Sequence, residues 1–185
     1  MNRKGTLILR DLDLLREAAE LTEVGTSFSV GFVDEGLSRR VEPGTPRPAA
    51  RLEAVRRLNE AGIPCGVLMA PILPFLADDD ERLEATVEAI AAAGATHVSP
   101  IVLHLRPGAR EWWMAWLEKE RPELVSRYCE LYGPGAYAPK EYQAEVAAKV
   151  RDLARRFGVG RNAPHEARSP RRIPEEPPQP EQLTL

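Results

Sequence analysis

The sequence predicts an α/β protein built on a parallel sheet, and three observations lead to this fold class. Short apolar segments alternate with segments whose apolar residues recur at helical spacing. The apolar segment 63–70 is nearly continuous, as expected of a strand covered on both faces, and 97–103 is expected to be a further buried strand. The connections between the segments are long enough for right-handed crossovers. This alternation is the pattern of βαβ units.

The expected elements follow one another along the chain in regular order. The helix at 46–61 has a proline at its start and Gly62 at its end. The helix at 79–93 begins with acidic residues, which its dipole favours, and ends at Gly94. The full series is a helix at 11–21, a strand at 24–33, a helix at 46–61, a strand at 63–70, a helix at 79–93, a strand at 97–103, and helices at 109–120, 122–132 and 139–157.

Three strands are too few for a free-standing parallel sheet, because two open edges and little covered area remain. Such sheets normally belong to larger, closed or doubly covered structures, so we expect the C-terminal half of a barrel. We expect residues 1–108 to form this half-barrel and 109–158 to form a helical extension. Residues 159–185, rich in Pro, Glu and Arg, are expected to be a disordered tail.

Composition excludes several classes of protein. The 25 basic and 28 acidic residues give a net charge of −3, which argues against a dedicated electrostatic nucleic-acid binder. Cys65 and Cys129 are the two cysteines, too few for a disulfide framework or for an iron–sulfur site built from this chain's thiols. No apolar stretch is long enough to span a membrane and no secretory signal is evident, so we expect a cytoplasmic protein without membrane contact.

Polar residues at the strand ends are the candidates for a site, because ligands of parallel sheets bind beyond the carboxyl ends of the strands. His104 and Arg106 follow the third strand. A neutral His could act as an acid or base there and the Arg could bind a carboxylate or phosphate, or both could simply cap the loop. Ser27 and Ser29 share one face of the first strand and could bind a ligand or form a small-residue packing layer.

Three further features each allow two interpretations. Arg51 could pair with Glu42 and fix the loop between them, or it could reach a ligand. The three tryptophans within 109–120 could pack on the core or form a stacking platform. The loop at 133–137 could be a substrate lid or a plain helix–helix connection.

Long stretches of the chain resemble the radical SAM superfamily, in the branch related to spore photoproduct lyase. The resemblance is carried by Glu42-Pro-Gly-Thr-Pro, by the run from Arg51 to Pro74, by Leu-His-Leu-Arg-Pro-Gly at 103–108, and by the segment 3–15. It implies a partial (β/α)6 TIM-like barrel, of which this chain would carry strands four to six. It also implies reductive cleavage of S-adenosylmethionine (AdoMet) at a [4Fe–4S] cluster, which releases a 5′-deoxyadenosyl radical.

The resemblance also implies roles for particular residues. Lys4 and Ser29, with Ser27 as the alternative, would contact the methionine part of AdoMet. An ammonium and a hydroxyl suit its carboxylate. Met69 and Pro71 would lie near the adenosyl part.

The same resemblance implies that His104 and Arg106 lie on the side of the site where the substrate binds. It assigns no catalytic residues. Relatives of spore photoproduct lyase repair a thymine dimer in DNA, so nucleic acid is a possible partner by resemblance that the net charge does not support.

The Cys-x-x-x-Cys-x-x-Cys loop that holds the cluster in this family is absent. We therefore expect this chain to be a fragment that binds no cluster or other metal alone and is inactive by itself. Its expected partners are an N-terminal half or a separate cluster-bearing chain, and an electron donor such as ferredoxin or flavodoxin. The alternative is a non-catalytic half-barrel module that binds or regulates such a chain.

Overall fold

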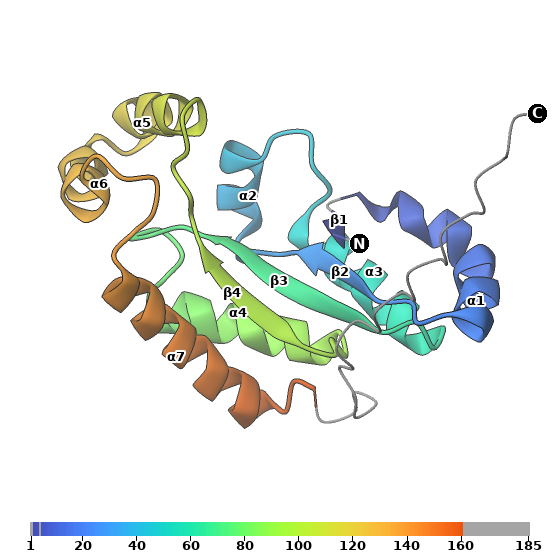
Figure 1. Ribbon diagram of the computed structural model, residues 1–185. Coiled ribbons are helices and arrows are strands. Elements are labelled where there is room, and N and C mark those ends of the chain that lie inside the picture. Colours follow the sequence, from blue (N-terminus) through green and yellow to red (C-terminus); the bar gives the residue numbers. More distant parts are fainter. Residues whose placement is uncertain (1, 4, 161–185) are drawn as a thin grey trace, which may run out of the picture.

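A four-stranded parallel sheet forms the centre of the protein (Figure 1). The computed structural model describes residues 2–3 and 5–160. The strands lie side by side in chain order, β1 (Asn2–Arg3), β2 (Thr26–Ser29), β3 (Cys65–Ile72) and β4 (Val98–Val102). The three predicted strands are confirmed. The additional strand β1 was not predicted, because two residues are too few to show a strand pattern in the sequence.

Helices join the neighbouring parallel strands, and each predicted helix is present. An unpredicted helix, α2, is capped by Asp34, whose carboxylate accepts a hydrogen bond from Leu37 N at 2.9 Å. The helices are η1 (Thr6–Asp11), α1 (Leu12–Leu21), α2 (Glu35–Val41), α3 (Pro48–Glu60), α4 (Asp80–Ala92), α5 (Ala109–Glu120), η2 (Pro122–Leu124), α6 (Val125–Tyr132) and α7 (Lys140–Phe157).

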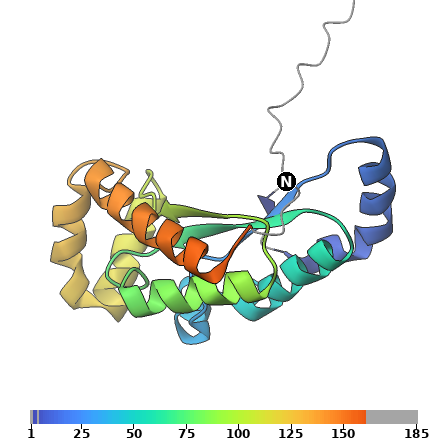
Figure 2. The same cartoon turned by 90° about the horizontal axis from the view of Figure 1, so that it is seen from below.

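Helices cover one face of the sheet. Figure 2 shows α3 and α4 on the same side of the strands, and α7 packs against α4 and β4. Leu58 of α3, Val87 of α4 and Val150 of α7 have no exposed surface. Val67 and Met69 of β3 are likewise fully buried. These residues form the core of the layer between sheet and helices.

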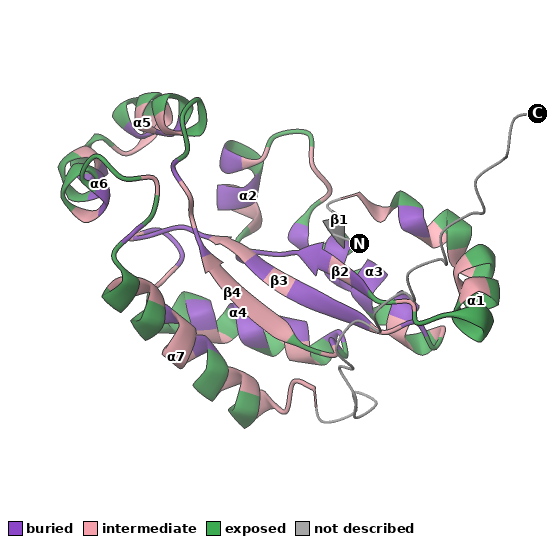
Figure 3. Ribbon diagram, in the orientation of Figure 1, coloured by how far each residue is buried: buried purple, intermediate pink, exposed green. Residues whose placement is uncertain are grey.

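The opposite face of the sheet is crossed by no helix within residues 5–160 (Figure 2). Leu68, which alternates with Val67 and Met69, is half-buried, and Figure 3 shows β4 as mostly intermediate in burial. The prediction that the strand at 63–70 is covered on both faces is therefore wrong within the described part of the chain. A continuous apolar run identifies a strand but cannot tell which of its faces a helix covers.

The C-terminal helices divide between two places. α5 and α6 lie beyond the carboxyl end of the sheet, whereas α7 returns along α4 (Figure 1). Of the three tryptophans of α5, Trp113 is buried and stacks on Trp116 at 4.9 Å, so the packing interpretation holds for these two, and Trp112 stays 52% exposed. The boundary at residue 108 stays a prediction.

The predicted tail falls outside the described residues from 161 onward. Among the helices that the structure describes, none combines the length and apolar character needed to cross a membrane.

Candidate functional site

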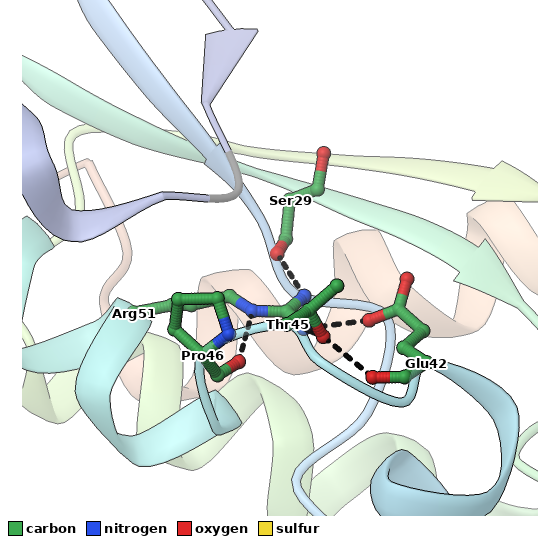
Figure 4. A network of polar contacts seen from close by, with 5 residues as sticks. All are labelled: Ser29, Glu42, Thr45, Pro46 and Arg51. Atoms are coloured by element: carbon green, nitrogen blue, oxygen red, sulfur yellow. Dashed lines mark hydrogen bonds and ion pairs between the residues drawn. The ribbon is translucent and has the colours of Figure 1, made fainter.

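A buried arginine organises the chain at the carboxyl end of β2 (Figure 4). Only 2% of the Arg51 side chain is exposed, and it donates four hydrogen bonds. Nε donates to Pro46 O at 2.7 Å and Nη1 to Ser29 O at 3.0 Å. Nη2 donates to the Glu42 carboxylate at 2.6 Å and to Thr45 Oγ1 at 2.8 Å. Thr45 in turn donates to the backbone carbonyl of Glu42.

This network decides between the two interpretations of Arg51. The guanidinium pairs with Glu42 and links the loop 42–46 to the end of β2. Its donors therefore bind oxygen atoms of the protein and stabilise this loop, as the first interpretation expects. A buried ion pair is stable only when further hydrogen bonds compensate for lost hydration, and here backbone and hydroxyl oxygens supply them. Figure 4 shows that the Ser29 carbonyl faces Arg51 while its hydroxyl points the other way.

Ser27 and Ser29 lie on the face of the sheet that no described helix covers. In the register, Ser27 pairs with Gly66 and Ser29 with Leu68, in rows that alternate with the buried Val67. Ser27 is half-buried and Ser29 is 5% exposed. Two neighbouring hydroxyls on this face suit a ligand carboxylate.

Met69 and Pro71 are placed differently from the serines. The Met69 side chain is fully buried on the helix-covered face, so only its backbone could reach a ligand on the serine face. Pro71 is half-buried, and its carbonyl oxygen would lie 2.1 Å from a Cβ at Gly31. Glycine at this position therefore lets the ends of β2 and β3 approach closely. Lys4, the remaining residue expected at AdoMet, lies outside the described residues.

A second group of polar residues lies beyond the carboxyl end of β4. His104 is half-buried, and its ring packs edge to face on that of Tyr137, with centroids 4.6 Å apart. Arg106 is exposed and donates to the Tyr137 hydroxyl at 3.5 Å. Burial, and secondly the charge of Arg106, lower the pKa of His104 below its usual value of 6.5, so the imidazole is neutral at pH 7.

The loop 133–137 is fastened to this strand end. Leu105 N donates to Ala136 O at 2.7 Å. Arg110 donates to Gly135 O at 2.8 Å and to Gly133 O. These hydrogen bonds hold the loop 133–137 against the residues that follow β4. Tyr137 belongs to the loop that the sequence offered as a possible lid, but its contact with His104 was not predicted, since nothing in the chain links the two residues before folding.

Two tyrosines hold the loop after β3 in a similar way. Tyr128, fully buried, donates to Pro74 O at 2.7 Å, and Tyr142 donates to the Asp78 carboxylate. Asp78 also accepts from Phe75 N at 2.7 Å, and Phe75 has a φ of 63°, which is uncommon for a residue with a side chain. Burial is the largest cause that raises the pKa of both tyrosines, so they stay protonated donors.

The described residues do not fit an iron–sulfur cluster. Cys65 is buried and its thiol pKa is raised mainly by burial, while Cys129 is exposed on α6. No group of three His, Cys, Asp or Glu side chains within the described part of the chain could hold a metal ion. Three thiolates at one point are therefore not available from these residues.

Sequence comparisons find relatives about twice as long as this chain. No family model matches. Uncharacterized proteins of Mycobacterium tuberculosis and Mycobacterium bovis are each 45% identical over 166 residues, which are 88% of this chain and 49% of theirs. An uncharacterized protein of Acidianus two-tailed virus is 35% identical over 133 residues, 67% of this chain and 44% of its own. The chain spans about half the length of the curated relatives it matches.

A structural comparison finds a spore photoproduct lyase double mutant with bound AdoMet and a dinucleoside spore photoproduct. The TM-score is 0.63, and the match covers 86% of this chain and 48% of that one at 20% identity. At this identity the similarity establishes the fold. The α/β half-barrel expected from the sequence is confirmed.

Proposed function

We propose that this chain is half of a radical SAM barrel and that, together with a cluster-bearing half, it cleaves AdoMet reductively. The observation that carries the proposal is the fold similarity, over 86% of the chain, to a lyase that was solved with bound AdoMet. The radical SAM activity, its cofactors and its substrate belong to this proposal, because the mycobacterial relatives are uncharacterized.

Ser27 and Ser29 are the residues that we propose for the methionine carboxylate, with Lys4 supplying the opposite charge. Arg51 is a positioning residue, since its bond to the Ser29 carbonyl fixes the strand end that presents the hydroxyl. AdoMet, when bound, supplies the adenosyl group for hydrogen abstraction. His104 is proposed for the substrate side.

The cluster belongs to another segment or chain in this proposal, because the described cysteines cannot supply three thiolates. Its electron donor would be a ferredoxin or flavodoxin. The alternative function, a half-barrel that binds a cluster-bearing chain without chemistry of its own, is favoured by the same lack of thiolates.

A chimera tests the proposal. In the Mycobacterium tuberculosis relative, the matched 166 residues are replaced by those of this chain. The chimera, the parent relative and the isolated chain are reconstituted anaerobically with iron and sulfide and reduced with dithionite. We expect about four irons per chain and 5′-deoxyadenosine from AdoMet in chimera and parent, and neither in the isolated chain.

Three outcomes would decide the matter otherwise. A parent without a cluster would remove the radical SAM proposal for the whole group. A stoichiometric cluster on the isolated chain would overturn the division of roles. A chimera that holds the cluster and yields no deoxyadenosine, beside an active parent, would favour the non-catalytic module.

A further inference from the structure

The β4 cluster, defined as His104, Arg106 and Tyr137, brings a cation, an imidazole and a hydroxyl to one strand end. We propose that this cluster binds an oxyanion group of the ligand, a carboxylate or a phosphate. The proposal rests on the proposed function in one respect, namely that the carboxyl end of β4 faces the substrate.

Arg106 is the charged member of the cluster. The structure shows no ion pair between its guanidinium and a carboxylate of residues 5–160, and the bond to Tyr137 is long, at 3.5 Å. A guanidinium has five donors in a planar fork that matches the two oxygens of a carboxylate or phosphate. Since Arg106 is exposed, most of these donors can reach a ligand.

Arg110 shows the contrasting use of the same side chain a few residues along. Its donors are directed to the carbonyls of Gly133 and Gly135, and so it fastens the loop that carries Tyr137. The bond from Leu105 N to Ala136 O adds a second fastening at 2.7 Å. The cluster is thereby held in place before any ligand arrives, which lowers the entropic cost of binding.

The other two members can donate without adding charge. His104 is neutral at pH 7 and carries one N–H donor in that state. The Tyr137 side chain is 50% exposed, and its hydroxyl can accept from Arg106 and still donate its own proton. An oxyanion here would meet a guanidinium, a hydroxyl and an imidazole, all of them able to donate.

Histidine signals in NMR spectra of the 185-residue chain test the proposal. The chain has three histidines, His97, His104 and His165. The NMR signals of His104 are identified by their loss in a His104→Gln variant. The chain is titrated with inorganic phosphate, and separately with acetate, at constant ionic strength set by chloride. We expect a saturable shift of the His104 signals with half-saturation on the order of 10 mM. We also expect the His104 pKa to rise when the anion binds, because a negative charge nearby favours the imidazolium.

Variants identify the group responsible. Arg106→Gln should abolish the saturable shift, Arg106→Lys should weaken it, and Arg57→Gln, at an exposed arginine of α3, should leave it unchanged. A stronger response to phosphate or to acetate assigns the ligand group. Absence of response to both ions, equal movement of His97, or a full response in Arg106→Gln would overturn the proposal. Deoxyadenosine formation by the chimera is measured separately, so the two proposals fail independently.

Discussion

Arginine serves two different purposes at the carboxyl ends of β2 and β4. Arg51 is 2% exposed, and four of its five donors are directed to backbone, hydroxyl and carboxylate oxygens of the protein. Arg106 is exposed and has one long hydrogen bond, to Tyr137. The burial and the hydrogen bonds of Arg51 show that it stabilises the site, whereas the exposed Arg106 has donors that can bind a ligand. Arg51 lies on α3 and Arg106 follows β4 directly, and for each of them the sequence alone left open whether it reaches a ligand.

The largest expected effect is on folding stability at the β2 end. Arg51→Met removes the guanidinium that pairs with the Glu42 carboxylate, which is 11% exposed, so we expect a loss of about 3–5 kcal/mol in the free energy of unfolding. Arg106→Met, its matched control, should change stability by less than about 0.5 kcal/mol. Urea unfolding of both variants measures the difference. Similar losses in the two variants would remove the distinction between the strand ends.

A smaller effect is expected from single hydroxyl groups. Tyr128→Phe removes the donor to the Pro74 carbonyl in a fully buried position and should cost about 1–2 kcal/mol. Tyr137→Phe removes the hydroxyl of a half-exposed residue and should be nearly neutral for unfolding. Thermal and urea unfolding would compare the two. If Tyr137→Phe proved the more damaging change, the β4 cluster would be a stabilising element instead of a binding one.

The smallest effect is a change in one pKa. Arg106→Gln removes the second cause of the low pKa of His104 and leaves burial, the first, in place. The pKa should therefore rise while staying below 6.5, as an NMR titration would show. An unchanged or lower value would mean that the Arg106 charge does not act on the imidazole.

The same shift sets a pH dependence of stability. Because the folded-state pKa of His104 is lower than its unfolded value, the unfolded chain binds more protons as pH falls. The contribution of neutral His104 to stability is fully present above pH 6.5 and declines below it. His104→Gln should reduce this decline in unfolding measurements between pH 7 and pH 5.

Much of the fold could be predicted from the sequence because β2, β3 and β4 are distinct apolar segments and the helices between them have apolar residues at helical spacing. The two-residue β1 and the seven-residue α2 have too few residues for any period to be recognised. The burial of Met69 was expected for this strand, but the face of the sheet on which it lies could not be predicted. Knowing that a residue lies at a strand end does not say which face it occupies, and a continuous apolar strand gives no hint of it.

Part of the candidate site could also be predicted from the sequence. His104 and Arg106 were identified from their place after a strand, a rule that holds for parallel sheets in general. Tyr137 joins them across 31 positions of sequence, through a loop whose path depends on the packing of α5 and α6. The Glu42–Arg51 pair was one of two alternatives, and only the burial of the guanidinium decided between them.

The amount of 5′-deoxyadenosine formed per cluster by the chimera with the Mycobacterium tuberculosis relative tests the central claim most directly. If this chain supplies half of an AdoMet-cleaving barrel, the chimera should form deoxyadenosine at a rate within about tenfold of the parent protein, a difference of about 1.4 kcal/mol in barrier. An active parent beside a chimera that carries the full cluster and forms none would contradict the claim.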